Sequence, residues 1–138
     1  MIKALELPPD IELYTLLHEA ASELYGDANV YSGELPPIEA AYPFAYIGGM
    51  NDTSLRTKNS LYGTISGQVD LWYGNTRERG DAARAKAKMM DKIRHFESDG
   101  YAWQVESLSG QILVDTTTAT ALLHAIVSYT LRYYYKED

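Results

Sequence analysis

Cysteine is absent from this 138-residue chain, which excludes a disulfide framework, a thiolate metal site and a cysteine nucleophile. Long apolar runs are absent as well. No segment approaches the roughly 20 apolar residues that cross a bilayer, and the N-terminal MIKALELPPD has only a few apolar residues before Pro8-Pro9. We therefore expect a chain that is neither exported nor membrane-spanning and that tolerates the cytosol.

Basic residues are few, because 12 Lys and Arg stand against 19 Asp and Glu, for a formal net charge of −7. Sequence-independent binding to nucleic acid needs clustered cations that neutralise phosphates, so this balance argues against it. The cations are unevenly placed. Residues 77–94 hold seven bases and three acids, a local charge of +4 that leaves −11 for the rest of the chain. Such a run is either a solvated face or a basic element that contacts an acidic surface of a neighbour.

Recognisable catalytic and metal-binding patterns are missing. The three histidines have no metal-ligand spacing with one another or with acids, which favours structural roles. They are His18, His95 and His124. Gly63–Gly67 is not followed by the Lys and Ser or Thr of a phosphate loop, and no Gly-x-Ser-x-Gly elbow occurs. Asp70 and Asp115 could work as a carboxylate pair only if the fold brought them together. We predict no enzyme activity, no metal and no cofactor.

The length and the 46% hydrophobic content suit one core, so we expect a single domain over residues 1–138. Two helices are predicted. The first covers about Asp10 to Tyr25, with Asp10 as its N-cap and Gly26 as its end, and the second covers about Arg79 to Phe96. Both have apolar residues at helical spacing. These are Leu13, Leu16, Leu17, Ala20 and Leu24 in the first helix, and Ala82, Ala85, Met89, Ile93 and Phe96 in the second.

Strands are predicted from period-two alternation between turn residues. The clearest is about Tyr62 to Tyr73, where Ile65, Val69, Leu71 and Tyr73 point to a core face, while the other face is polar and includes Trp72. Residues 101–107 and 111–116 are predicted to form a tight hairpin across Ser109-Gly110. The other strands are about Asn29 to Tyr31, Pro43 to Ile47 and Leu123 to Tyr133, and a helix over Ala119 to Ala125 is an alternative for the start of the last one.

The polar segment Met50 to Ser60 separates two strand-like runs. Gly48-Gly49 ends the first run, and the segment is longer than the about 2–5 residues that close most hairpins. It carries two bases, Arg56 and Lys58, and too little apolar content to fold on itself. We interpret it as an assembly loop that becomes ordered on contact with a partner. A mobile surface loop without a partner is the alternative.

The order of these elements resembles that of the tail terminator proteins of long-tailed bacteriophages, which are minor tail or tail-completion proteins. The stretches that carry the resemblance are PFAYIGG, GTISGQVDLWYG, NTRERGDA and LLHAIVSYTLRY, within roughly Asp10 to Tyr134. The resemblance implies an α+β fold, with a mostly antiparallel sheet of about four to five strands and two main helices packed on one face.

The resemblance also implies a structural virion protein that assembles as a hexameric ring. Such a ring caps the tail tube, stops its polymerisation and offers a head-tail joining surface. Its partners would be further copies of itself, the major tail tube protein and the head connector. DNA would pass through without specific binding, which the acidic balance fits because like charges repel. The protein would lie at the head-proximal end of the virion tail after assembly in the host cytoplasm.

Three alternatives stay open: a head-completion or neck adaptor protein, a small non-viral binding module, and a small enzyme. Under the terminator hypothesis, two sets of residues are expected to contact a neighbouring subunit or the tail tube. They are Asn51, Asp52, Arg56 and Lys58 in the polar segment, and Arg77, Arg79, Arg84 and Lys88 in the basic segment.

Overall fold

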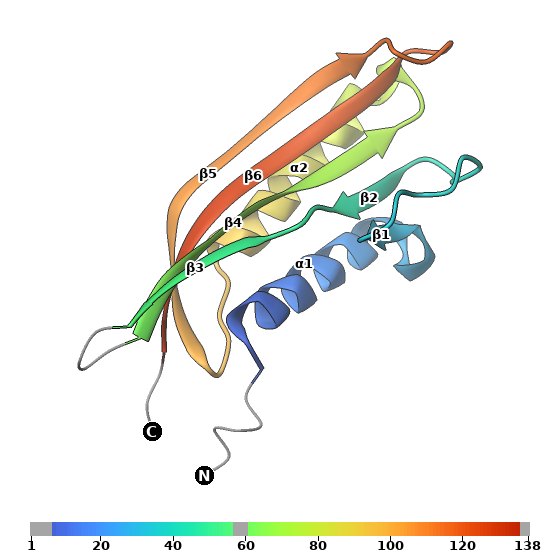
Figure 1. The fold of residues 1–138 in the computed structure, drawn as a ribbon. Coiled ribbons are helices and arrows are strands. Elements are labelled where there is room, and N and C mark those ends of the chain that lie inside the picture. The colour runs from blue at the N-terminus through green and yellow to red at the C-terminus, as the bar shows by residue number, and fades with distance from the viewer. Residues whose placement is uncertain (1–6, 57–60, 136–138) are drawn as a thin grey trace.

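The computed structural model describes residues 7–56 and 61–135 and has an α+β fold, as predicted. Within these described residues, two helices are accompanied by one sheet of six strands, rather than four to five (Figure 1). The helices are α1 (Pro9–Tyr25) and α2 (Arg79–Arg94). The short 3-10 turn η2 (Asp27–Asn29) follows α1, and a second one, η3 (Thr76–Glu78), precedes α2. The strands are β1 (Val30–Ser32), β2 (Phe44–Ile47), β3 (Asn51–Arg56), β4 (Leu61–Tyr73), β5 (Tyr101–Asp115) and β6 (Leu122–Tyr135).

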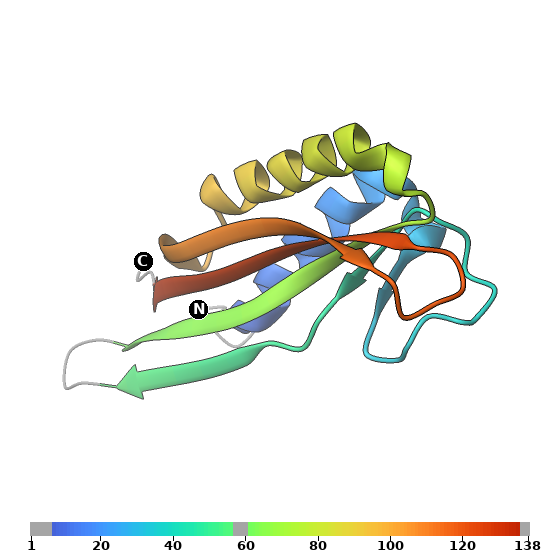
Figure 2. The same ribbon diagram turned by 90° about the horizontal axis from the view of Figure 1, so that it is seen from above.

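The sheet has the order β1-β2-β4-β6-β5, and every pair except β1 and β2 is antiparallel. β3 lies off this path, because it pairs with the first half of β4 while β2 pairs with the second half. Both helices cover the same face of the sheet (Figure 2), which confirms the predicted packing. None of the described helices lies on the opposite face, which we call the helix-free face.

The core lies between the sheet and the two helices, where the predicted faces are confirmed. Ile65, Val69 and Leu71 of β4 are fully buried, and alternate residues of β6 from Leu123 to Tyr133 are buried on the same face. The helix stripes meet these strands through Leu13 and Leu17 of α1 and Ala82, Ala85, Met89 and Ile93 of α2. The prediction of Asp10 as the N-cap of α1 is wrong, because the N-cap is Pro8 and the first helical residue is Pro9. Proline suits that position, where its missing N–H has no helical partner.

The prediction of a loop from Met50 to Ser60 is wrong for Asn51–Arg56, which forms β3. Its residues pair with β4 from Asn51 opposite Ser66 to Arg56 opposite Leu61. The 13-residue β4 is much longer than the four-residue β2, and buried backbone N–H and C=O groups need partners. Pairing through the backbone does not require apolar side chains, so a polar segment can form the strand that pairs with β4. Only residues 57–60 then connect the two strands, and Lys58 lies outside the described residues.

The prediction of a tight hairpin across Ser109-Gly110 is also wrong, because β5 is one continuous strand paired with β6. A Cβ at Gly110 would lie 2.8 Å from both Lys86 Cδ and Met90 Sδ of α2. The glycine therefore marks a close approach of the helix to the strand rather than a turn. The alternative helix over Ala119 to Ala125 is wrong as well, since β6 begins at Leu122.

Several tyrosines are held in the core in the neutral form. Burial raises the pKa of Tyr129 above its ordinary value, and that of Tyr25, whose hydroxyl lies 2.7 Å from the hydroxyl of Tyr73. Burial, followed by the hydrogen bond to Asp52, also raises the pKa of Tyr133. Because these pKa values are raised, the unfolded chain loses protons at a lower pH than the folded chain.

The stability should therefore be constant from pH 7 to 9 and fall above about pH 10, by about 1.4 kcal/mol per pH unit for each such tyrosine. Denaturant unfolding across an alkaline pH series measures this. Tyr129→Phe is the sharp comparison, because the Tyr129 hydroxyl is buried without a hydrogen bond to any described residue. The variant should be at least as stable as the parent at pH 7. Above about pH 10, its free energy of unfolding should fall less steeply with pH, by about 1.4 kcal/mol per pH unit, because one titrating tyrosine is gone. An unchanged slope would contradict the assignment.

Candidate assembly surfaces

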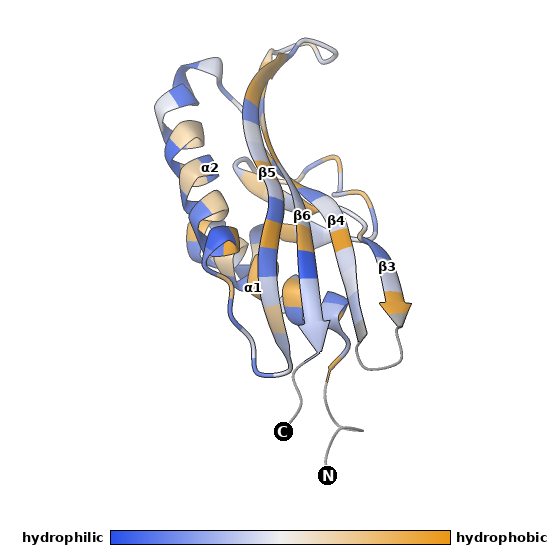
Figure 3. Cartoon of the chain, turned by 90° about the vertical axis from the view of Figure 1, so that its left-hand side faces the viewer, coloured by the Kyte–Doolittle hydropathy of each residue, from blue (hydrophilic) through white to orange (hydrophobic). Residues whose placement is uncertain are grey.

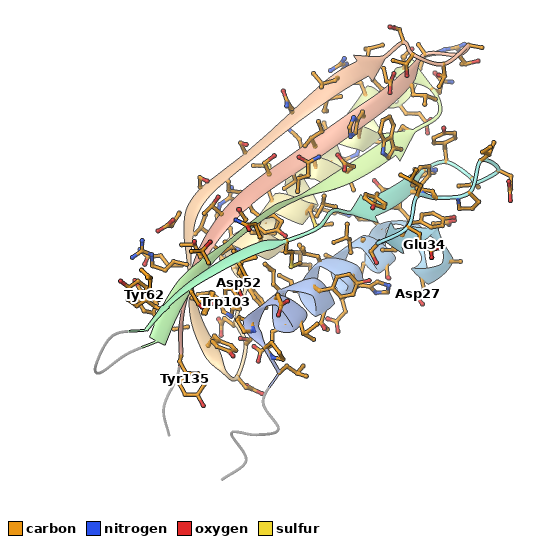
Figure 4. The ribbon with its side chains drawn as sticks, viewed as in Figure 1. Asp27, Glu34, Asp52, Tyr62, Trp103 and Tyr135 are labelled. Carbon is orange, nitrogen blue, oxygen red and sulfur yellow. The ribbon has the colours of Figure 1, made fainter. Side chains whose placement is uncertain are left out.

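β3 contains three residues of the first predicted set, Asn51, Asp52 and Arg56, whereas Lys58 lies outside the described residues. Asp52 is not free there, because its Oδ1 accepts a hydrogen bond of 2.8 Å from the Tyr133 hydroxyl of β6. Tyr133 reaches it across Gly63, whose added Cβ would lie 2.6 Å from the Tyr133 hydroxyl oxygen and from the Thr53 carbonyl oxygen. Figure 4 labels Asp52 in this strand. Asp52 thus joins β3 to the sheet.

Aromatic side chains gather at the end where β3 stops and β4 begins. The rings of Tyr62 and Tyr134 stack with centroids 6.0 Å apart, and the guanidinium of Arg132 lies 5.8 Å from the Tyr62 ring centroid. Arg132 Nε also donates a hydrogen bond of 2.8 Å to Glu106. Leu55 of β3 is 55% exposed. Tyrosine and exposed leucine are residues that suit a protein contact, so this end is an apolar and aromatic surface rather than a purely polar loop.

The second set of predicted contact residues lies at and after the start of α2. Arg79, Arg84 and Lys88 of the helix and Arg77 of η3 are exposed. The Arg84 guanidinium pairs with Asp81 at 2.6 Å, and farther along the helix Lys92 and Arg94 also pair with acids of this chain. Arg77 and Arg79 have no ion pair with any described residue. The uncommitted arginines are therefore concentrated at the N-terminal corner of α2, which we call the arginine corner.

The fold keeps these two sets apart. Arg56 pairs with Leu61 at the start of β4, whereas the arginine corner follows Tyr73 at the end of β4 (Figure 1). A strand rises about 3.3 Å per residue, so the 13 residues of β4 separate the two surfaces by about 40 Å. One neighbouring molecule of this size could contact both only along the whole length of the sheet.

A groove on the helix-free face was not predicted from the sequence. The segment between β1 and β2, residues 33–43, lies beside the connection from β5 to β6 at one end of the sheet (Figure 2). The groove has a volume of about 490 Å3. Its lining is Leu35, Pro36, Pro37, Ile38, Ala40, Tyr42, Phe44, Tyr46, Asp70, Trp72, Asp115, Thr118 and Leu122. Phe44 and Leu122 are buried here, so this end of the helix-free face is not simply polar.

Asp70 forms the floor of this groove, which we call the Asp70 groove. It is 8% exposed and is the only buried charged residue within the described ranges. Its Oδ1 accepts hydrogen bonds from His124 Nε2 at 2.6 Å and from Gln68 Nε2 at 3.0 Å. The imidazole of His124 in turn stacks on Trp72, with centroids 3.8 Å apart and an interplanar angle of 12°.

Register explains why these side chains meet. Trp72 of β4 lies directly opposite His124 of β6, and Asp70 lies two residues before Trp72 on the same face. Asp115, at the end of β5, lines the same groove. The fold thus brings Asp70 and Asp115 to one groove, but with His124 against Asp70 rather than as a carboxylate pair. The alternation of both strands is visible in the sequence, whereas their relative register is not.

Neither a metal site nor a membrane span is found in the part of the chain that the structure describes. No cluster of three His, Cys, Asp or Glu residues is placed to hold a metal ion there. His18 lies 3.7 Å from Asp27, and His95 lies 3.3 Å from Asp91, each in a separate pair on the surface. Among the described helices, none is both long and apolar enough to cross a membrane.

No family model matches the chain, and a search of curated proteins finds no match. Solved structures do resemble it. A chain in a structure of the virion of a native gene transfer agent particle is 15% identical, with 88% of this chain and 91% of that chain covered and a TM-score of 0.51. The gp17 protein of bacteriophage SPP1 is 23% identical, with 90% and 83% covered and a TM-score of 0.44. The first likeness shows a shared fold.

Proposed function

We propose that this protein is a structural component of a phage-type virion, and that it acts as a tail terminator. As a ring of subunits, six by the family resemblance, it caps the tail tube, stops the addition of further tube subunits and presents the surface that joins the tail to the head. The observation that carries the proposal is the fold, which a chain of a virion particle shares over 88% of this sequence.

The distribution of charge supports self-association. The arginine corner is uncommitted within the described chain, while the remainder of the chain outside residues 77–94 carries a formal charge of −11. A surface on one copy that fits a different surface on the next copy gives a head-to-tail contact, which closes into a ring when the rotation permits. The acidic excess also suits passage of DNA, because like charges favour sliding over binding.

The β3–β4 end is the surface that we assign to the tail tube. By this end we mean the last residues of β3 and the first residues of β4, where Leu55, Tyr62 and Tyr134 lie. Arg56 is the last residue of β3, and Lys58 follows it in the sequence. The chain would then work as one domain without enzyme activity or a cofactor. Its place would be the head-proximal end of the tail, next to the tube protein on one side and the head connector on the other.

Assembly of the purified chain should depend on salt. Light scattering at low ionic strength and high protein concentration should give a multimer, and the mass should fall as salt is added because ions screen exposed charge pairs. Electron microscopy of the low-salt sample should show closed rings. A mass that stays monomeric at low salt and high concentration would contradict the proposed ring.

The capping activity itself is tested with tube subunits. Adding the chain to a polymerising phage tail tube protein should shorten the tubes in proportion to the amount added. A ring that assembles but leaves tube length unchanged would instead favour a neck adaptor, which joins the head without ending the tube.

A further inference from the structure

We propose that the Asp70 groove binds the arginine corner of a second copy of this chain, and that this contact joins neighbouring subunits. The inference rests on the proposed function, since it names the surfaces by which the ring would close. It also narrows the contact residues expected in the basic segment to Arg77 and Arg79. It assigns a binding partner to a groove that was not predicted from the sequence.

The groove has the chemistry to accept a guanidinium group. Both hydrogen bonds that Asp70 accepts end on Oδ1, and no described residue donates to Oδ2. Asp115 lies at the rim, where hydrogen bonds from the Thr117 hydroxyl and backbone N–H lower the pKa of its carboxyl group, so that it is charged at neutral pH. Of the described lining residues, none is Lys or Arg. The site therefore holds two carboxyl groups without Lys or Arg, and among the described residues the basic side chain that contacts Asp70 is His124.

Aromatic rings make the groove a better fit for arginine than for lysine. Trp72 and Tyr42 line it beside Asp70. A planar guanidinium can stack on an aromatic face while its N–H groups bind a carboxylate, whereas an ammonium group is a more strongly hydrated point charge. The arginine corner supplies two such groups with no ion pair to another described residue. The charge and the aromatic lining of the groove thus both suit the arginine side chains of the second surface.

The groove and the arginine corner of one chain lie on opposite faces of the sheet. η3 leads from the end of β4 to α2 on the helix-covered face, while the groove lies on the helix-free face (Figure 2). Both are at the same end of β4, because the groove contains Trp72 and η3 starts four residues later. Complementary surfaces at one level on opposite faces allow rotation between copies without a shift along the sheet. Such a head-to-tail contact closes a ring when the rotation between copies permits it.

Exposed apolar side chains beside the groove support a protein occupant. Leu35 is 86% exposed and Ile38 fully exposed, on either side of Pro36-Pro37. Leu113 of β5 is 45% exposed on the helix-free face opposite His124, where Figure 3 shows an apolar stretch of that strand. Proline fixes the backbone dihedral φ and reduces the freedom that the segment loses when a partner covers it. A second copy would cover these side chains together with the acidic floor.

The test uses two variants, each defective in one surface. Arg77→Glu/Arg79→Glu reverses the arginine corner, and Asp70→Asn/Asp115→Asn neutralises the groove while keeping its shape and the acceptor for His124. The matched controls are Arg84→Glu/Lys88→Glu, on the same helix, and Glu97→Gln/Asp99→Asn, outside the groove. Thermal unfolding should show that all four stay folded. Light scattering at low salt then measures the protein concentration at which each assembles.

We expect each of the two surface variants to need at least a tenfold higher concentration to assemble, and the controls to behave like the parent. A mixture of the two surface variants should give a one-to-one dimer that grows no further, because one intact groove and one intact arginine corner remain. This inference would be overturned if both surface variants assembled as well as the parent, or if the controls were as defective as the surface variants. Either result would leave the proposed ring standing. A parent that never assembles would overturn the proposed ring as well.

Discussion

Leu71→Asp should lower the free energy of unfolding by about 4 kcal/mol or more, since burying an unpaired charge in a packed core is among the most destabilising single changes. Leu71 is fully buried in the core and lies opposite Ala125 of β6. No position for a solvating water or a counter-ion is expected there. Urea unfolding followed by circular dichroism measures the loss, and the variant should be largely unfolded at 37 °C.

Thr64→Asp is the matched control on the same strand. Thr64 lies on the helix-free face opposite Arg132 of β6, so the new carboxylate would be partly hydrated and close to a cation. We expect a change within about 1 kcal/mol, the range that strand propensity spans in a host protein. If Thr64→Asp unfolded the protein and Leu71→Asp did not, the faces of β4 would be exchanged, as a one-residue slip in register requires.

The elements that sequence reasoning predicted well are those whose burial imposes a period. Leu71 and its neighbours on β4 alternate because one face of that strand is buried in the core, and β6 alternates for the same reason. Met89 and Ile93 recur at helical spacing because α2 buries one stripe. In each case the apolar residues recur at a regular spacing in the sequence because the element has one buried face and one exposed face.

The elements that sequence reasoning missed are held by other forces. β3 is joined to β4 by backbone hydrogen bonds and by the Tyr133–Asp52 contact, neither of which leaves an apolar pattern in Asn51–Arg56. Gly110 looked like a turn because a glycine that admits a helix side chain is identical in sequence to one that turns the chain. Tertiary contacts decided both cases.

The Asp70 groove could not be predicted for a third reason, which is distance along the chain. Asp70 and His124 are 54 residues apart, and they meet only once β4 and β6 pair with Trp72 opposite His124. A slip by one residue would move His124 away from Trp72 and turn one partner to the other face. The arginine corner, by contrast, belongs to a basic segment that the sequence shows plainly. The sequence does not show which bases of that segment the fold leaves without an ion pair.

Gly63→Ala should cost about 1–3 kcal/mol, the usual cost of overpacking, and should loosen β3 in particular. The new Cβ would lie 2.6 Å from the Thr53 carbonyl oxygen, which is backbone, and from the Tyr133 hydroxyl oxygen. One of the two must move, so either the β3–β4 pairing or the hydrogen bond from Tyr133 to Asp52 is lost. Hydrogen exchange should become faster at the amides of Asn51–Arg56 than at those of β6.

Gly49→Ala is the control for that substitution, because a Cβ at Gly49 meets nothing within 4 Å and its φ is not positive. It should be neutral or stabilising by about 0.4–1 kcal/mol, since alanine restricts the unfolded chain. If the two variants had the same stability and the same hydrogen exchange in β3, Tyr133 would not need a glycine at position 63 to reach Asp52. If Gly63→Ala instead loosens β3 as expected, tube capping should weaken while salt-dependent ring formation persists, because the β3–β4 end and the arginine corner lie at opposite ends of β4.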